Sequence, residues 1–132
     1  MSTKDVGNIS EAMILAALVR TGHALLRPFG DNLRYDLAID DGGKLIRVQC
    51  KTGKLKRGAV EFSASSSQCH RGRGRQNYRG QADVFGVYCP QLNKAYLIPV
   101  SDCGLTRCRL RIQPARNGQR THIRDAKRYE IA

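Results

Sequence analysis

The sequence predicts an α/β (α+β) fold formed by a single domain that spans residues 1–132. Three observations support this class: a helical pattern near the N-terminus, a glycine-centred β-hairpin after it, and several short alternating stretches later in the chain. A chain of 132 residues suits one hydrophobic core. Its hydrophobic content of 41% predicts a globular protein and argues against disorder.

The first predicted element is a helix over residues 8–21. Asn8 suits the N-cap, Glu11 three residues later would complete a capping box, and Gly22 is a typical end signal. Five side chains are expected on its partly apolar face, namely Ile9, Met13, Ala16, Ala17 and Arg20. Glu11 has two interpretations, either a capping residue or an acidic group directed at the hairpin that follows.

A β-hairpin over residues 35–51 is the strongest local signal, and a short strand predicted at residues 23–27 precedes it. Gly42 and Gly43 suit a two-residue turn, because both central positions of such a turn need positive φ. The resulting register pairs apolar residues on one face of the hairpin: Ile39 with Ile46, Leu37 with Val48, and Tyr35 with Cys50.

The other face of the hairpin carries the candidate catalytic residues Asp36, Gln49 and Lys51. In this register Asp36 lies opposite Gln49, at a Cβ separation of about 4.5–5.5 Å, and Lys51 follows on the same side. A carboxylate with carbonyl oxygens can hold Mg²⁺, which polarises a phosphate and activates a water, while a lysine stabilises developing charge. These residues therefore suit metal-assisted phosphodiester cleavage. The alternative is a half-buried hairpin whose solvated face is merely charged.

The rest of the chain predicts further strands and a closing helix. The strands are expected at residues 59–63, 83–89 and 94–100 and around Leu110 and Ile112. The closing helix is expected over residues 119–129, with Ile123 and Ala126 facing the core.

The formal net charge of +12 is distributed unevenly along the chain. Residues 1–50 contain six Lys or Arg and six Asp or Glu, so the whole excess lies in residues 51–132. Such a basic segment indicates a nucleic-acid partner, the alternative being a solvated surface. The residues expected to bind DNA lie in the connection after the hairpin and in an Arg/Gly-rich loop: Lys54, Lys56, Arg57, Arg71, Arg73, Arg75 and Arg79. Tyr78 in this loop is interpreted as an anchor for the returning chain, with base stacking as the alternative.

Five cysteines form an odd number, and no secretory signal precedes them, so we expect reduced thiols and a cytoplasmic protein. A zinc site formed by Cys69 and His70 with Cys103 and Cys108 is disfavoured, because the paired spacing of a structural zinc motif is missing. No stretch approaches the length of a transmembrane helix, so we expect no membrane partner.

With these residues in place, the chain resembles the PD-(D/E)XK nuclease superfamily. It is similar in particular to the branch that includes a homing endonuclease encoded within a group I intron. The similarity spans nearly the whole chain in the correct order. The matching stretches are Gly7-x-x-Ser10-Glu11-Ala12, Pro28-Phe29-Gly30-Asp31, Tyr35-Asp36-Leu37, Val48-Gln49-Cys50-Lys51-Thr52-Gly53, Asp83-Val84-Phe85-Gly86-Val87-Tyr88, Tyr96-Leu97-Ile98-Pro99-Val100, Leu110-Arg111-Ile112 and Asn117-x-Gln119.

The resemblance implies a restriction-endonuclease-like core, with a central mixed sheet flanked by helices, and Mg²⁺-dependent cleavage of double-stranded DNA, with Mn²⁺ as a substitute. Asp36 and Lys51 take the places of the aspartate and lysine of the motif. Glu11 matches an extra acidic residue that some members carry on the first helix, and the backbone carbonyl of Cys50 would complete the metal shell. Gln49 departs from the usual Asp or Glu, but the intron-encoded branch shares this glutamine.

Three functions follow as alternatives. The first is a site-specific endonuclease of the homing type. The second is a structure-specific nuclease such as a Holliday-junction resolvase, which would share the catalytic residues but read backbone shape instead of bases. The third is a basic DNA-binding module without catalysis, which Gln49 keeps open. A chain of this size covers little DNA, so a long target site would need a homodimer or homotetramer.

Overall fold

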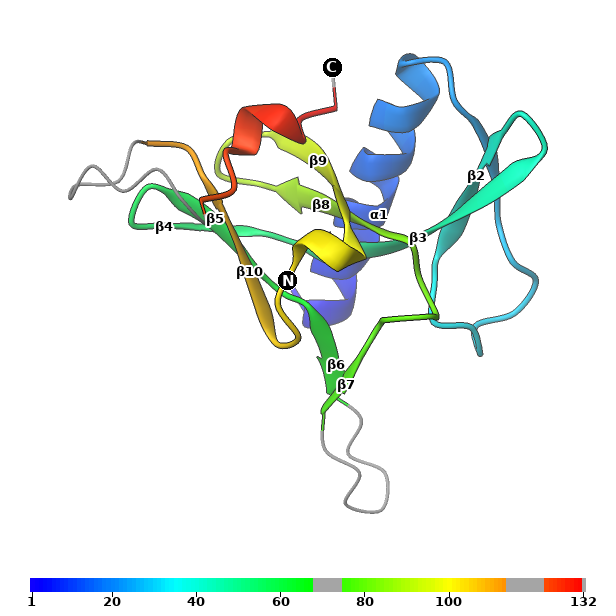
Figure 1. Cartoon of the computed structure of the whole chain (residues 1–132), viewed down its shortest axis with the longest axis horizontal. Coiled ribbons are helices and arrows are strands. Elements are labelled where there is room, and N and C mark those ends of the chain that lie inside the picture. Colours follow the sequence, from blue (N-terminus) through cyan, green and yellow to red (C-terminus); the bar gives the residue numbers. More distant parts are fainter. Residues whose placement is uncertain (68–74, 114–122, 132) are drawn as a thin grey trace.

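The computed structural model describes residues 1–67, 75–113 and 123–131. One long helix, α1 (Thr3–Arg20), packs against a five-stranded sheet with the strand order β1-β2-β3-β8-β9 (Figure 1). The strands of this sheet are β1 (Ala24–Leu26), β2 (Leu37–Asp41), β3 (Lys44–Thr52), β8 (Val84–Cys89) and β9 (Lys94–Pro99). Strands β3 and β8 are parallel, whereas the other neighbours are antiparallel. The predicted α+β class with a central mixed sheet is therefore confirmed.

Two smaller sheets extend from the central one. The first has the order β10-β5-β4, with β10 (Arg107–Arg111), β5 (Ala59–Ser63) and β4 (Lys54–Lys56). The second pairs β6 (Ser65–Ser67) with β7 (Arg75–Asn77). Two short 3-10 helices, η2 (Val100–Asp102) and η3 (Ala126–Arg128), complete the described elements. The segment predicted as a basic connection after the hairpin is thus a strand, β4.

The core has two parts, one on each side of the central sheet. Ile14 and Leu18 of α1 pack on Leu37 and Val48 of the hairpin. Gly86 of β8 lets the helix approach closely, because a Cβ there would lie 2.8 Å from Ile14 Cγ2. The second part lies between the sheets and includes Val60, Phe62, Phe85, Tyr96 and Leu110. Strand β8 contributes to both parts, with Tyr88 in the first and Phe85 in the second, so it is packed on both faces.

The predicted hairpin register is confirmed as far as Leu37. Gly42 and Gly43 have φ of 61° and 93°, as the turn requires, and Asp41 pairs with Lys44. The ladder then continues to the pair Leu37–Val48. A short turn with two flexible residues therefore sets the partner of every following residue.

The predicted start of the first helix is wrong. Its N-cap is Ser2, whose side chain accepts from the Asp5 N–H while the Asp5 side chain accepts from the Ser2 N–H. This capping box replaces the predicted one at Asn8, which lies inside α1. The predicted apolar face is also wrong: the buried positions of α1 are Ser10, Ile14 and Leu18, whereas Ile9 and Met13 are exposed.

The predicted closing helix is not formed by the described part of its range. Residues 123–131 contain only the single turn of η3, capped by the Asp125 side chain. The backbone groups of this segment instead bond to neighbouring strands. Arg111 N–H donates to Arg124 O, and Leu97 N–H donates to Tyr129 O. Ala126 is buried, as predicted. Residues 119–122 of the predicted helix lie outside the described residues.

Within the described part of the chain, no helix combines the length and apolar character needed to cross a membrane.

Candidate active site

Asp36 lies just before β2, where the hairpin ladder ends. Its N–H donates to Val48 O at 2.8 Å, and its Oδ2 accepts from the Cys50 N–H at 2.8 Å. The paired residues stop at Leu37–Val48, so the predicted direct pairing of Asp36 with Gln49 is not formed. The Asp36 carboxylate, in place of a backbone carbonyl, accepts the hydrogen bond from the Cys50 N–H. This bond holds the carboxylate beside β3.

Gln49 and Lys51 flank Cys50 on β3. The Gln49 Nε2 lies 3.4 Å from the Cys50 carbonyl oxygen, which it can reach as a long hydrogen bond. The Lys51 Nζ donates to Tyr78 Oη at 3.1 Å and to Ser65 O at 3.3 Å. Asp36 and Gln49 therefore both contact the peptide groups of Cys50, and the charge of Lys51 acts on Asp36.

Glu11 reaches the same region from the middle of α1. Its Oε1 accepts from Arg27 Nη2 at 2.7 Å, and its side chain is 24% exposed. Its position inside the helix rules out the capping interpretation, because Ser2 and Asp5 cap the N-terminus. The second interpretation, an acidic group near the hairpin, agrees with this geometry, since the charge of Asp36 acts on Glu11.

Both carboxylates are harder to ionise than ordinary ones. Burial raises the pKa of Asp36, and the Cys50 N–H bond and the positive charges of Lys51 and Arg27 offset only part of the increase. Burial also raises the pKa of Glu11, and the nearby Asp36 raises it further. Two half-buried groups that repel each other as anions would be stabilised by a cation between them.

The donor chemistry of this site fits Mg²⁺. Two carboxylates and a backbone carbonyl are hard oxygen donors, and Mg²⁺ usually takes few protein ligands while it keeps several waters. The Cys50 thiol is an unsuitable donor because burial and the charges of Asp36 and Glu11 raise its pKa. Among residues 1–67, 75–113 and 123–131, no three His, Cys, Asp or Glu side chains gather as a metal-binding group. The site therefore offers only a few protein oxygen ligands, which suits an ion that keeps several waters.

Sequence reasoning missed the groups that hold the lysine. Tyr78 is only 3% exposed, its ring centroid lies 4.6 Å from Lys51 Nζ, and Arg34 stacks on the ring at 4.2 Å. Arg34 also donates to Gln76 Oε1 at 2.8 Å and so joins β7 to the site. The interpretation of Tyr78 as an anchor is confirmed. Its contact with Lys51 had no signal in the local sequence, because it depends on the pairing of β6 with β7.

A second missed contact joins α1 to the end of β3. The hydroxyls of Ser10 and Thr52 lie 2.5 Å apart, and Ser10 is buried. This bond fixes the helix that carries Glu11 relative to the strand that carries Lys51. The only indication of this contact in the sequence was the position of Ser10 next to Glu11 on the predicted helix.

The residues predicted to bind DNA are distributed differently. Lys54 and Lys56 are exposed on β4, and Arg57 is exposed in the turn that follows, with φ of 51°. Arg79 Nη2 donates to Cys103 O at 3.2 Å. Arg75 belongs to β7, but its side chain is not among those described, and Arg71 and Arg73 lie outside the described residues.

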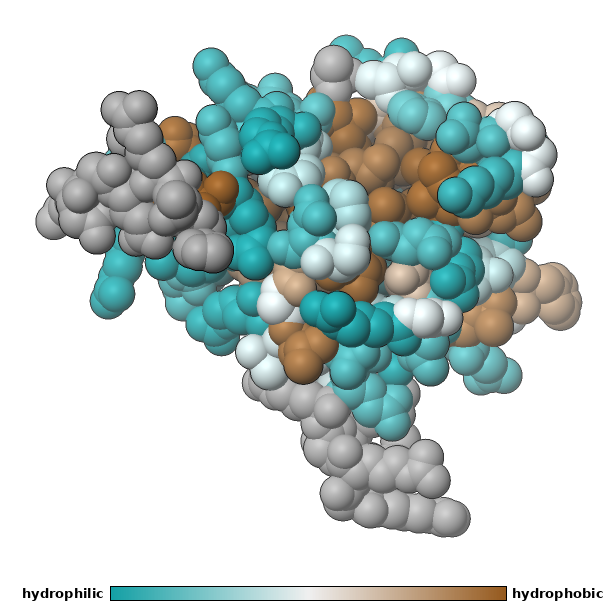
Figure 2. Space-filling model, viewed as in Figure 1, coloured by the Kyte–Doolittle hydropathy of each residue, from teal (hydrophilic) through white to brown (hydrophobic). Residues whose placement is uncertain are grey.

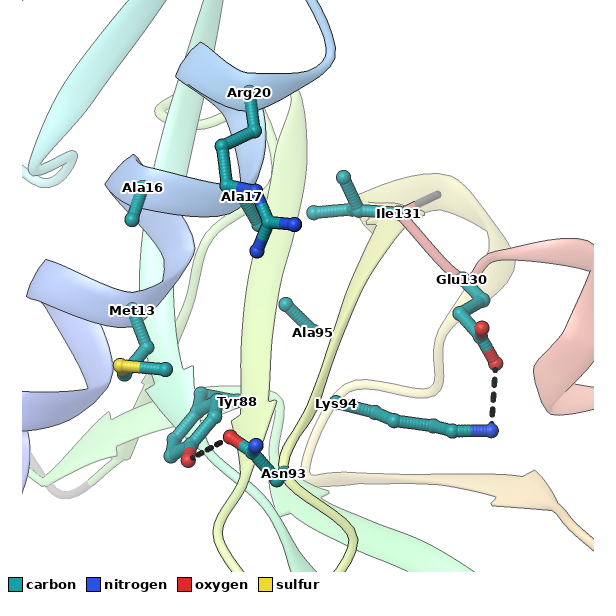
Figure 3. Close-up of a pocket in the computed structure, with 10 residues that line it drawn as sticks. All are labelled: Met13, Ala16, Ala17, Arg20, Tyr88, Asn93, Lys94, Ala95, Glu130 and Ile131. Carbon is teal, nitrogen blue, oxygen red and sulfur yellow. Dashed lines mark hydrogen bonds and ion pairs between the residues drawn. The ribbon is translucent and has the colours of Figure 1, made fainter.

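A groove of about 270 Å³ lies elsewhere, between α1 and β9 (Figure 3). Tyr88 Oη donates to Asn93 Oδ1 there at 2.7 Å, and Lys94 forms an ion pair with Glu130 at 3.3 Å. None of the predicted catalytic residues lines it. The candidate active site is therefore defined by the carboxylates around Cys50 and not by this groove.

Comparison with known proteins found a matching family model and a similar solved structure. A solved structure described as that of a bacterial homing endonuclease, I-Ssp6803I, is similar with a TM-score of 0.76 and 28% sequence identity. The match covers 98% of this chain and 89% of that one. No curated protein matches the sequence. The family model described as PD-(D/E)XK endonuclease matches residues 1–132, which confirms the predicted DNA endonuclease function. The chain thus belongs to the PD-(D/E)XK endonuclease family.

Proposed function

We propose that this protein is a Mg²⁺-dependent endonuclease of the homing type that hydrolyses phosphodiester bonds in double-stranded DNA. The observation that carries the proposal is the pair of half-buried carboxylates, Asp36 and Glu11, which act on each other electrostatically, with the Lys51 ammonium acting on Asp36. The similarity to a bacterial homing endonuclease supports the homing type.

We assign Glu11, Asp36 and the Cys50 carbonyl oxygen as the ligands of Mg²⁺. When bound, the ion polarises the scissile phosphate and activates a water for attack on phosphorus. The Cys50 N–H bond orients the Asp36 carboxylate before the ion arrives, and Arg27 holds Glu11 in place. Mn²⁺ prefers the same oxygen ligands and is expected to substitute.

The contacts of Lys51 and Gln49 support a separate role for each. Tyr78 Oη and Ser65 O hold the Lys51 ammonium in one position, so its charge is already oriented when negative charge develops on the phosphate oxygens. Gln49 bonds to the Cys50 carbonyl through Nε2, which leaves the amide oxygen as the end suited to orient the attacking water. Gln49 adds no charge, so Glu11 serves as the second carboxylate.

We further propose that the protein acts in the cytoplasm as a homodimer or homotetramer. Four described cysteines, Cys50, Cys89, Cys103 and Cys108, are free, as expected in a reducing compartment. A protomer of 132 residues offers limited surface to DNA, and a symmetric assembly would extend the recognised site. Sedimentation of the free protein and of its DNA complex measures the subunit number.

Cleavage of supercoiled plasmid tests the proposal. Nicking or linearisation should require Mg²⁺, stop with a chelator and return with Mn²⁺. Wild-type protein that binds a plasmid library with random inserts but cleaves none of its members in either metal would contradict the proposal and leave a non-catalytic DNA-binding role. A parallel assay on linear duplex and on a four-way junction separates the homing type from a resolvase, which would prefer the junction.

A further inference from the structure

We propose that the solvent-facing side of the three-stranded sheet β10-β5-β4 binds the DNA backbone and guides it into the candidate active site. This inference rests on the proposed function and adds the place where phosphates are bound. We call this surface the basic sheet face. Its cationic residues are Lys54, Lys56, Arg107 and Arg109.

The alternation of buried and exposed residues defines the face. On β5, Val60 and Phe62 are buried in the core, whereas Glu61 between them is only partly buried. On β10, Cys108 and Leu110 are buried in the same way. Because side chains alternate along a strand, Arg107 and Arg109 project from the opposite side. In Figure 2, hydrophilic side chains are visible beside and below the grey atoms at the left of the view, where Figure 1 places β4, β5 and β10.

The strand register brings the charges together. Lys54 pairs with Glu61, and Glu61 pairs with Arg109, so these residues form one row across three strands. Arg107 pairs with Ser63 in the next row. Cross-strand neighbours lie about 4.5–5.5 Å apart at Cβ, which is close enough for several cations to act on one stretch of phosphates.

Glu61 holds both arginines without neutralising the face. Its Oε1 lies 3.4 Å from Arg107 Nη1, and its Oε2 lies 3.1 Å from Arg109 Nε. Glu61 is 15% exposed, whereas the Arg107 and Arg109 side chains are 63% and 42% exposed. One carboxylate therefore orients two guanidinium groups whose remaining N–H groups face solvent. Four cationic side chains outnumber this single acid.

The basic sheet face is joined rigidly to the active site. Gly53 connects β3 to β4, and a Cβ at this position would lie 2.6 Å from Val60 Cγ1 and 2.9 Å from Val87 Cγ1. The Gly53 N–H also donates to Tyr88 O at 2.8 Å. Lys51 and Lys54 are three residues apart in a nearly extended chain, which spans about 10 Å. Measured along the helix axis of B-DNA, that distance equals the rise of about three base pairs, at about 3.4 Å each.

A groove of about 210 Å³ lies at the basic sheet face. Its walls include Lys54, Glu61 and Arg107, and also Thr52, which follows Lys51 in the sequence. A strand of DNA whose scissile phosphate lay at Lys51 would thus continue over fixed positive charges. Surface ion pairs contribute little to stability, so a purely structural role gives no reason for two arginines on one glutamate.

The test is the salt dependence of binding to a random-sequence DNA duplex in a chelating buffer, where cleavage is blocked. The double variant Arg107→Gln/Arg109→Gln should lower the magnitude of the log–log slope by about 2, because each lost phosphate contact contributes about 1. The matched control is Arg20→Gln/Lys44→Gln, which removes the same charge from the end of α1 and the hairpin turn. It should leave the slope nearly unchanged.

An equal change in both double variants would show that only net charge matters and would overturn the proposal. An unchanged slope with a lower melting temperature would show that the two arginines contribute to stability alone. This result would also overturn the proposal. Arg107→Gln by itself, at the more exposed arginine, should change the slope by about 1 and keeps the test available if the double variant unfolds. Plasmid cleavage by wild-type protein separates the two claims. Cleavage without a slope change refutes only the basic sheet face, whereas a slope change without cleavage refutes only the proposed catalysis.

Discussion

The carboxylate pair and the basic sheet face meet at the end of β3, and they are built in opposite ways. Asp36 and Glu11 are like charges brought together in a half-buried place, where burial and repulsion raise their pKa values. Arg107 and Arg109 are exposed cations that share one acid on the surface of a sheet. The first arrangement costs free energy in the folded protein, whereas the second costs little.

This difference distinguishes the residues expected to act in cleavage from those expected to act in DNA binding. A few desolvated groups around one peptide can hold an ion and act strongly on one phosphate, so each is difficult to replace. Exposed cations contribute similar increments to affinity, so the loss of one is tolerated. Variants of the carboxylate pair should therefore change the cleavage rate, and variants of the cationic surfaces should change affinity and its salt dependence.

The largest effect is expected for Asp36→Asn. We expect the single-turnover cleavage rate to fall on the order of 10³-fold, because a ligand charge is removed from a preorganised site. Asparagine can still accept from the Cys50 N–H, so folding should persist, and DNA binding should be retained or tighter. The matched control is Asp41→Asn in the exposed hairpin turn, which should cleave normally. A wild-type rate in Asp36→Asn would refute the metal-site assignment.

Glu11→Gln and Gln49→Ala sharpen the comparison within the site. Glu11→Gln should slow cleavage about 10²-fold because it removes a charge, and Gln49→Ala should slow it only about tenfold because it removes a neutral amide. Gln49→Glu should retain cleavage with altered metal preference, since it adds a third carboxylate. Rapid-quench rates over a range of Mg²⁺ concentrations measure all three. If Glu11→Gln lowers only the melting temperature, Glu11 does not bind the metal.

The Arg/Gly-rich stretch that the sequence predicts to bind DNA provides the corresponding variant for binding. Replacing Arg71, Arg73 and Arg75 with Ala should weaken DNA binding and lower the magnitude of the log–log salt slope by about 3. The rate at which bound DNA is cleaved should not change. Fluorescence anisotropy with duplexes of several sequences measures this. An unchanged slope would show that the loop does not contact DNA, and a loss confined to one sequence would assign it a base-reading role.

Part of the fold and site could be predicted because it depends on local chemistry. The Gly42–Gly43 turn sets the hairpin register and thereby places Asp36 near Cys50. Tyr78 could not be connected to Lys51 in this way, because they are 27 residues apart and meet only through tertiary pairing.

The incorrect helix predictions also have physical causes. The sequence of Asn8 and Glu11 fits a capping box, but Ser2 and Asp5 fit another one nearer the N-terminus, and the structure forms the latter. The sequence pattern of residues 119–129 favoured a closing helix. There, the backbone groups of Arg124, Tyr129 and Ile131 bond to neighbouring strands, so tertiary hydrogen bonds override local propensity.

The smallest effect concerns stability, and its size depends on pH. The folded protein binds a proton at Asp36 more tightly than the unfolded chain does, because burial raises this pKa. Stability therefore falls as pH rises from the unfolded pKa through the raised folded pKa. Asp36→Asn should melt at a higher temperature than wild type at neutral pH without metal, and the difference should shrink as the pH is lowered. Mg²⁺ should stabilise wild type more than the variant.

Asp83 provides the opposite case on the same sheet. Arg47 donates to its two oxygens at 3.1 Å, through Nε and Nη2, and lowers the pKa of its carboxyl. The Asp83 interaction therefore stabilises the protein above the unfolded pKa and is lost as pH falls through the lowered folded value. Asp83→Asn should destabilise at neutral pH, and the loss should shrink in acid. Melting curves of both variants from acid to neutral pH, without metal, check the pair. If Asp36→Asn also destabilised at neutral pH, the carboxylate would be stabilised as an anion without a metal, and the reason for placing a cation between Asp36 and Glu11 would disappear.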